Sequence, residues 1–200
     1  MDKHQALKHY FGHTQFRPGQ ERLIDAILSG RDALGIMPTG GGKSLCYQIP
    51  ALLLPGVTLV ISPLISLMKD QVAALKKSGI DAAFLNSSLT GDQLRTVYRR
   101  TREGAYKLLY VAPERLEGDG FAALARELEL SLVAVDEAHC ISQWGQDFRP
   151  SYLNIAAFVA ALPRRPVVAA FTATATADVQ GDITRLLGLQ DPACAVTGFD

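Results

Sequence analysis

Short apolar runs alternate with helical stretches along nearly the whole chain. The runs are rich in β-branched residues and apolar at consecutive positions, which is typical of parallel strands buried on both faces. The strands predicted in this way cover residues 33–37, 57–61, 82–85, 108–111, 132–135 and 167–171. Between the strands the pattern predicts helices from about residue 43, over 64–78 and over about 90–102. Such alternation forms right-handed βαβ units, so we predict an α/β fold with a mostly parallel sheet sandwiched between helices.

The composition suits a globular protein with a single core. The chain has 200 residues, of which 48% are hydrophobic and 20% charged, and its formal net charge is zero. That length fits one α/β domain better than two small ones. A net charge of zero indicates that any DNA-binding surface is local. Because the N-terminus lacks a signal core and no apolar run reaches membrane-spanning length, we expect a cytosolic protein without a membrane partner, associated with the nucleoid if bacterial.

Three cysteines, Cys46, Cys140 and Cys194, lie far apart in the sequence and form no Cys-x-x-Cys pair. Zinc sites and disulfide frameworks need paired or closely spaced cysteines, so this spacing argues against both. We therefore expect three reduced, buried thiols.

A glycine-rich turn follows the first predicted strand and opens the next helix. Residues 37–44 read MPTGGGKS, the pattern of a phosphate-binding loop except for Met37, where the strict pattern has glycine. Glycines let backbone N–H groups approach phosphate oxygens, and the lysine and serine are predicted to contact the β- and γ-phosphates and Mg²⁺. The predicted ATP-binding residues of this loop are Thr39, Gly40, Gly41, Gly42, Lys43 and Ser44. An ordinary glycine-rich turn is the alternative.

Two carboxylates, Asp136 and Glu137, stand at the carboxyl end of the predicted strand 132–135. Ligands of open α/β sheets bind at that edge. We predict that Asp136 holds Mg²⁺ through its water shell, together with Ser44, and that Glu137 polarises the attacking water. His139 follows and would link this site to neighbouring loops. A surface Asp-Glu pair and a structural histidine are the alternatives.

The sequence DEAH at residues 136–139, combined with a Lys-Ser phosphate loop, resembles the superfamily 2 helicases. Residues 138–150, AHCISQWGQDFRP, resemble the aromatic-rich loop of the RecQ family of DNA helicases. At Gln146 that family commonly has histidine, and glutamine can form hydrogen bonds but cannot carry charge. Further matches cover nearly the whole chain, at residues 10–12, 16–20, 62–71, 110–116 and 171–176. The resemblance implies a RecA-like P-loop domain.

The resemblance also implies roles for individual residues. Around the adenine it places Tyr10, Arg17 and Gln20, and the glutamine amide can donate to and accept from the base at once. On the DNA side, or coupling DNA to ATP, it places Ser62, Ser66, Lys69, Gln143, Trp144, Phe148, Arg149, Thr172 and Thr174.

Several of these DNA-side residues have a second interpretation. Trp144 and Phe148 would either stack on unpaired bases or pack into the core. The threonines at 172, 174 and 176 would either bridge Asp136 or His139 to DNA or cap the next helix. Basic clusters at residues 76–77 and 99–102 read as solvated helix faces.

The RecQ resemblance implies a 3′-to-5′ DNA helicase that acts in DNA repair and recombination, with ATP and Mg²⁺ as cofactors. Its expected partners are single-stranded and tailed duplex DNA, a single-strand-binding protein, and further domains of the same protein. Residues 1–200 would form the first RecA-like domain, with a helical adenine-reading segment over about 1–30. We expect the chain to be cut at a domain boundary, without the second RecA-like, zinc and winged-helix domains, and not to unwind DNA alone.

Two rival functions remain open on the sequence. One is an RNA helicase of the same superfamily, which only the aromatic-rich loop distinguishes. The other is a non-motor module that uses ATP as a switch, whose hydrolysis would not respond to single-stranded DNA.

Overall fold

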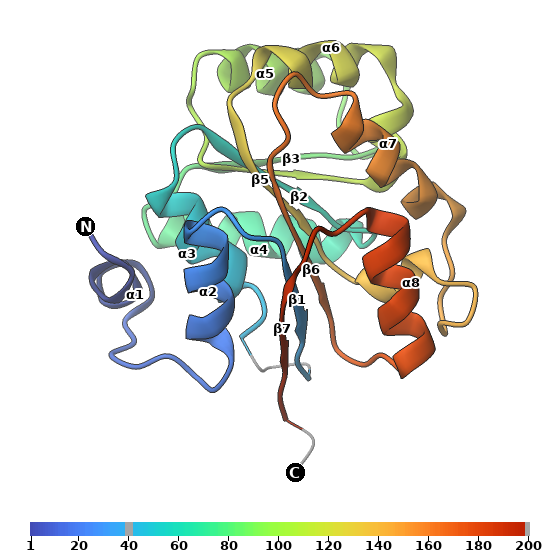
Figure 1. Cartoon of the computed structure of the whole chain (residues 1–200). Helices are drawn as coiled ribbons and strands as arrows, with labels where there is room; N and C mark the ends of the chain where they lie inside the picture. Colours follow the sequence, from blue (N-terminus) through green and yellow to red (C-terminus); the bar gives the residue numbers. More distant parts are fainter. Residues whose placement is uncertain (39–41, 199–200) are drawn as a thin grey trace.

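A seven-stranded, fully parallel sheet forms the centre of the molecule in a computed structural model that describes residues 1–38 and 42–198 (Figure 1). Along the sheet the strand order is β3-β4-β2-β5-β6-β1-β7. The strands are β1 (Ala33–Ile36), β2 (Val57–Ile61), β3 (Ala82–Leu85), β4 (Leu108–Val111), β5 (Leu130–Val135), β6 (Val167–Thr172) and β7 (Ala193–Val196). The first six confirm the predicted strands to within two residues at either end. The predicted fold class is therefore confirmed.

The sequence pattern predicts no strand at β7, and the structure corrects this. β7 pairs only with β1 and forms an edge of the sheet. Its residues alternate between buried and exposed, with Cys194 and Val196 on the outside. Four residues of alternating burial give no continuous apolar run, which is the signal on which the other strands depend. The exposure of Cys194 also makes the expectation of three buried thiols wrong for that residue, whereas Cys46 and Cys140 are buried.

Helices cover both faces of the sheet. They are α1 (Lys3–Phe11), α2 (Gln20–Leu28), α3 (Leu45–Leu53), α4 (Ile65–Lys77), α5 (Gly91–Arg102), α6 (Asp119–Glu127), α7 (Ile155–Ala160) and α8 (Ala177–Leu187), with short 3₁₀ helices η1 (Pro113–Glu117), η2 (Ala138–Ile141) and η3 (Pro150–Asn154). The predicted helices over 64–78 and 90–102 are α4 and α5, and the helix expected from about residue 43 is α3. The N-terminal helical segment consists of α1 and α2. Within the described residues no helix is long and apolar enough to span a membrane.

Each face of the sheet has its own apolar core. On one face, α2, α3 and α4 pack against strand residues such as Val60 and Phe171. On the other, α6, α7 and α8 pack against residues such as Leu59 and Ile61. Neighbouring residues of β2 thus point to opposite faces, and all are buried. This explains why the strands read as continuous apolar runs rather than as alternating ones.

The strand order decides which loops meet. β5, β6 and β1 lie side by side, so their carboxyl ends lie at one edge of the sheet. The phosphate loop follows β1, Asp136 follows β5, and Thr172 ends β6. Three motifs that are 33 or more residues apart in sequence are therefore brought to one place, which is where open α/β sheets bind their ligands.

The amino ends of β1 and β6 are held together by an ion pair between the buried carboxylate of Asp32 and the partly exposed guanidinium of Arg165. Asp32, only 2% exposed, accepts two hydrogen bonds from Arg165, at 3.0 Å to one carboxylate oxygen and 2.7 Å to the other. The same carboxylate accepts the main-chain N–H groups of Val168 at 3.0 Å and Gln190 at 2.7 Å. One side chain thus connects the start of β1 to the start of β6 and to the segment before β7.

Candidate functional site

A cavity of about 670 Å³ opens at the carboxyl edge of the sheet, beside the phosphate loop. Its lining comes from the segment before and at the start of α2, the phosphate loop, α3, α4 and the end of β5. The predicted nucleotide-site residues that line it are Tyr10, Arg17, Gln20, Gly42, Lys43, Ser44, Asp136 and Glu137. The structure therefore brings these residues together in one cavity. Thr39, Gly40 and Gly41 lie outside the described residues.

Gln20 links the adenine-side segment directly to the phosphate loop. Its side chain is 1% exposed; Oε1 accepts the Arg17 main-chain N–H at 2.8 Å, and Nε2 donates to the Gly42 carbonyl at 3.0 Å. Gly42 has a φ of 79°, and a Cβ there would overlap the Gln20 amide. Glycine is therefore required at this position both by the backbone conformation and by the close approach of Gln20. Contact between Gln20 and adenine stays a prediction.

Lys43 and Ser44 lie at the N-terminal end of α3, where helix dipoles favour anions. Ser44 accepts the main-chain N–H of Gln48 through its carbonyl at 2.9 Å, and its hydroxyl makes no capping bond to the helix. Ser44 and Asp136 line the same cavity. A hydroxyl and a buried carboxylate are hard oxygen donors, which fit a Mg²⁺ ion that keeps several waters.

Asp136 is buried at 6% exposure, and its Oδ1 accepts the main-chain N–H of Glu137 at 2.9 Å. Burial, and secondarily the charge of Glu137, raises the pKa of Asp136 to about 6, although the Glu137 N–H and Lys43 act in the opposite direction. Glu137 itself adopts the left-handed conformation, with φ 51° and ψ 43°. For a non-glycine residue this costs about 1–2 kcal/mol, and such strain clusters at functional sites.

We expect Asp136→Asn to stabilise the nucleotide-free protein at pH 8. Because folding raises the pKa of Asp136 from 3.8 to about 6, its contribution to stability is fully present below pH 3.8 and is lost as the pH rises through 6. Asparagine keeps the bond to Glu137 without the charge, so its gain should approach roughly 3 kcal/mol at pH 8 and vanish near pH 4. Thermal melts across this pH range test the expectation.

The matched control for that experiment is Asp70→Asn, since Asp70 is an exposed carboxylate on α4. It should shift the melting temperature little, and equally at every pH. Equal stabilities of wild type and Asp136→Asn at pH 8 would show that the buried charge costs nothing.

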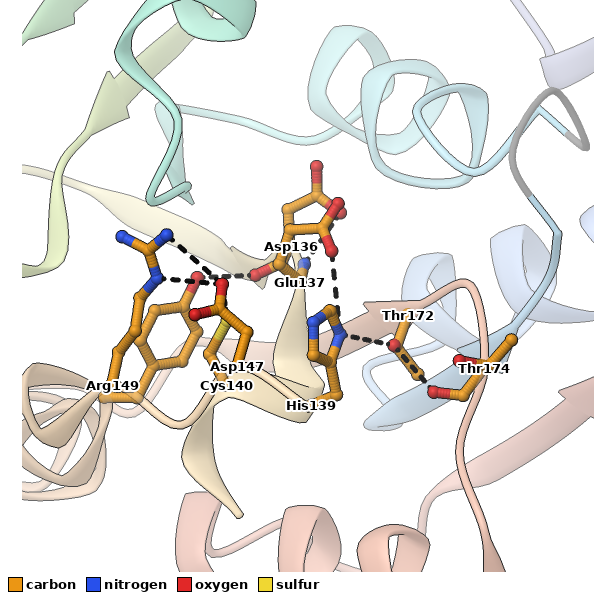
Figure 2. A network of polar contacts seen from close by, with 9 residues as sticks. Asp136, Glu137, His139, Cys140, Asp147, Arg149, Thr172 and Thr174 are labelled. Carbon is orange, nitrogen blue, oxygen red and sulfur yellow. Dashed lines mark hydrogen bonds and ion pairs between the residues drawn. The ribbon is translucent and has the colours of Figure 1, made fainter. Parts of the chain in front are cut away.

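His139 joins the acidic site to the end of β6 (Figure 2). Its Nδ1 lies 2.8 Å from the Thr172 hydroxyl and 3.5 Å from Glu137 Oε2. The Thr172 hydroxyl donates to the Thr174 carbonyl at 3.1 Å, so it is left to accept from His139, which assigns a proton to Nδ1. Thr172 is fully buried and Thr174 exposed. Thr172 thus forms the bridge to His139. Thr176 instead caps α8, because its hydroxyl accepts the N–H of Val179.

The aromatic-rich loop stands at the surface next to this network. Trp144 is 79% exposed, so the interpretation that it packs into the core is wrong. Gln143 and Gln146 are also exposed, and Phe148 is half-buried. Arg149 is partly exposed and pairs with Asp147, at 3.2 Å from both Nε and a terminal nitrogen to Oδ2. The loop thus offers an indole to solvent.

Of the predicted DNA-side residues, Arg149 lines a second cavity, of about 540 Å³. The other lining residues follow β2, β3 and β4, such as Pro63, Asn86 and Arg115. Ser66 and Lys69 are exposed on α4, and Lys69 Nζ lies 5.9 Å from the centre of the Phe84 ring. Ser62 is only 3% exposed, so Ser66 and Lys69 offer more surface for the predicted contact with a DNA backbone. Lys76, Lys77, Arg99, Arg100 and Arg102 are exposed, as their interpretation as solvated faces requires.

Sequence reasoning misses three residues that hold the aromatic-rich loop and the acidic pair before it: Ser142, Tyr152 and Asp182. The Ser142 hydroxyl donates to Asp182 on α8 at 2.8 Å and accepts the Trp144 N–H at 3.1 Å. The Tyr152 hydroxyl donates to the Asp136 carbonyl at 2.8 Å. A buried tyrosine reads in a sequence as part of the core, and nothing local shows that its hydroxyl reaches back 16 residues.

The profile of the DEAD/DEAH box helicases matches residues 17–181 of the chain. The ATP-dependent DNA helicase RecQ of Bacillus subtilis (strain 168) is 52% identical over 194 residues, which is 96% of this chain and 33% of that protein. RecQ of Haemophilus influenzae is also 52% identical, over 97% of this chain and 31% of the relative. The resemblance to RecQ helicases is thereby confirmed. This chain spans about a third of the length of these curated relatives.

Solved structures share the fold at lower identity. The DUF1998 helicase MrfA bound to DNA has a TM-score of 0.76 and 17% identity, over 98% of this chain and 29% of that one. A hypothetical ATP-dependent RNA helicase from Sulfolobus tokodaii has a TM-score of 0.72 and 20% identity, over 96% of this chain and 56% of that one. These likenesses show that the chain shares the α/β fold of these structures.

Proposed function

This chain belongs to the DEAD/DEAH box helicase family, and we propose that it is the ATP-binding motor domain of a DNA helicase that couples ATP hydrolysis to movement on single-stranded DNA. The observation that carries the proposal is one continuous polar network. It runs from Asp136 and Glu137 in the nucleotide cavity through His139 to Thr172, and His139 lies in the loop that also carries the exposed indole of Trp144.

ATP would bind with its phosphates at the amino end of α3. Lys43 supplies the charge-assisted contact to the outer phosphates. Mg²⁺, held by the Ser44 hydroxyl and the Asp136 carboxylate, would neutralise charge on the phosphate oxygens. Glu137 lies next to Asp136 in the same cavity and is partly exposed, which supports the proposal that its carboxylate orients and polarises the attacking water.

DNA would act on hydrolysis through the loop after η2. A base stacked on Trp144 would shift the segment that begins at His139, which lies 3.5 Å from Glu137. Because His139 is also hydrogen-bonded to Thr172, a shift of His139 would move the end of β6 as well. The position of the catalytic carboxylate would thus depend on whether DNA is bound.

Two observations favour DNA over RNA. The relatives are named DNA helicases, and residues 138–150 of this chain resemble the aromatic-rich loop of RecQ DNA helicases. The test compares hydrolysis by the intact protein with single-stranded DNA, with RNA and without nucleic acid. Stimulation by DNA alone supports the proposal. Stimulation by RNA alone would favour the RNA helicase, and equal rates in all three would favour an ATP switch.

Trp144→Ala is expected to lower DNA-stimulated hydrolysis about fivefold or more while leaving ATP binding nearly intact. Since Trp144 is 79% exposed, the substitution should change the free energy of unfolding by only about 0.5 kcal/mol. An ATPase titration with single-stranded DNA, run beside a thermal melt, measures both quantities. An unchanged response to DNA would remove the loop from the coupling mechanism.

Gln20→Ala is expected to weaken ATP binding much more than GTP binding. A site that hydrogen-bonds a base edge discriminates against ligands that lack the matching groups, because its own polar groups are left unpaired. Gln20 also holds Arg17 and Gly42, so a purely structural role would weaken both nucleotides equally. Competition binding with the two nucleotides separates these outcomes, and Gln15→Ala, at an exposed glutamine that also lines the cavity, is the control.

We further propose that the intact protein unwinds tailed duplex DNA in the 3′-to-5′ direction in the cytoplasm, in DNA repair and recombination. A second RecA-like domain would close the nucleotide site, and a single-strand-binding protein would be a partner. The relatives named RecQ, three times as long as this chain, support the need for further domains.

A further inference from the structure

The peptide bond between Asp136 and Glu137 is held at both of its polar ends. Its N–H bonds to the Asp136 carboxylate at 2.9 Å, and its carbonyl accepts the Tyr152 hydroxyl at 2.8 Å. This matters because the next residue, Glu137, is in the left-handed conformation. Strained backbone persists only where the surroundings over-determine it, so the orientation of this peptide sets where the Glu137 carboxylate points.

Tyr152 is well suited to hold that peptide. It is fully buried within η3, and burial raises the pKa of its phenol well above the usual value, so the hydroxyl remains a donor. The carbonyl of Asp136 is a main-chain acceptor at the end of a buried strand. A buried carbonyl that loses its hydrogen-bond donor is left with an uncompensated desolvation cost. The bond from Tyr152 therefore stabilises the observed orientation of the peptide between Asp136 and Glu137.

The other end of Tyr152 is tied to the aromatic-rich loop. Its main-chain N–H donates to the carbonyl of Arg149 at 3.0 Å, and the N–H of Arg149 donates to the carbonyl of Cys140 at 2.8 Å. The loop that carries Trp144 therefore closes on η2 and passes directly into η3. Through these bonds a displacement of Arg149 would be passed on to Tyr152.

We propose that Tyr152 is a positioning residue that transmits the state of the aromatic-rich loop to Glu137 through the carbonyl of Asp136. This inference rests on the proposed function, since it names a second route by which DNA controls hydrolysis. It differs from the His139–Thr172 route in its physical form, because it acts on the main chain of the acidic motif rather than on a side chain.

Coupling is reciprocal, which gives a test without enzymatic turnover. Trp144 is the only tryptophan of the chain and lies in the loop, so its fluorescence reports the loop alone. Titration of this 200-residue chain with Mg²⁺ and a non-hydrolysable ATP analogue is expected to change the Trp144 emission in the wild type. In Tyr152→Phe this change should be lost, although a labelled analogue still binds.

Hydrolysis by the intact protein supplies the second measurement. In Tyr152→Phe the ratio of the DNA-stimulated rate to the basal rate is expected to fall about tenfold. The Kd for single-stranded DNA, measured by fluorescence anisotropy, is expected to stay unchanged. The matched control is Thr101→Val, which removes another buried hydroxyl, bonded to the carbonyl of Val97 on α5, far from the site. It should keep both the fluorescence response and the ratio.

The outcomes separate the two proposals. If DNA does not stimulate the wild type, the proposed function and this inference both fail. If DNA stimulates wild type and Tyr152→Phe alike, only the inference fails. It is also overturned if basal and stimulated rates fall in equal measure, which indicates a merely structural tyrosine, or if DNA affinity falls in parallel with the rate. Should Tyr152→Phe melt at a lower temperature than Thr101→Val, the fluorescence titration is performed below both transitions and decides by the same criterion.

Discussion

Replacing Lys43 by alanine is expected to lower ATP hydrolysis by the intact protein about 10²–10³-fold, the loss typical of removing one electrostatic contact to the transition state. Lys43 lines the nucleotide cavity at the amino end of α3, next to the carboxylate of Asp136. Its ammonium is the predicted charge-assisted contact to the γ-phosphate, and charge on the transferring group is spread over its oxygens in the transition state. Steady-state phosphate release measures the rate.

The control for Lys43→Ala is Lys76→Ala, because Lys76 is an exposed lysine near the end of α4. It loses the same side chain and charge outside the cavity and should hydrolyse ATP like the wild type. Hydrolysis by Lys43→Ala within about tenfold of wild type, a loss of less than about 1.4 kcal/mol, would exclude Lys43 from the mechanism. Since Lys43 also lowers the pKa of Asp136, the variant should in addition raise that pKa further.

Asp32→Ala is expected to destabilise the protein by about 2–4 kcal/mol, because it removes a buried carboxylate that accepts main-chain N–H groups, and such a group left unsatisfied costs about 1–3 kcal/mol. The carboxylate of Asp32 accepts four hydrogen bonds, two from Arg165 and one each from the main chain of Val168 and Gln190. Alanine leaves the buried N–H of Val168 and the partly buried N–H of Gln190 without an acceptor, and the guanidinium of Arg165 without its partner. Unfolding in urea, followed by circular dichroism, measures the loss.

Asp32 lies at the edge of the sheet opposite the nucleotide cavity, so Asp32→Ala should bind ATP normally below its melting temperature. The control is Glu127→Ala, which breaks the exposed pair with Arg102 at 3.1 Å and should cost less than about 1 kcal/mol. Equal stability of the two variants would show that the four hydrogen bonds accepted by Asp32 contribute no more to the free energy of unfolding than a surface ion pair does.

Much of this protein could be predicted from sequence because the signals are local. Continuous apolar runs identify β1 to β6, since a strand buried on both faces has few polar positions. The glycine-rich turn before Lys43 and the acidic pair after β5 identify the nucleotide site, because both motifs lie where a strand ends. The edge strand β7 is not predicted, because half of its side chains face solvent and it therefore has no continuous buried run.

The tertiary structure alone decided how those motifs meet. The order β5-β6-β1 brings Asp136 and Thr172 to the phosphate loop, and no local pattern encodes the order of strands. Packing exposes Trp144 rather than burying it, although the same residue type commonly lies in a core. The bonds from Gln20 to Gly42 and from Tyr152 to Asp136 span 22 and 16 residues. A hydrogen bond depends on tenths of an ångström between atoms that only the folded sheet brings together, whereas apolar periodicity and glycine-rich turns act within a few residues of the chain.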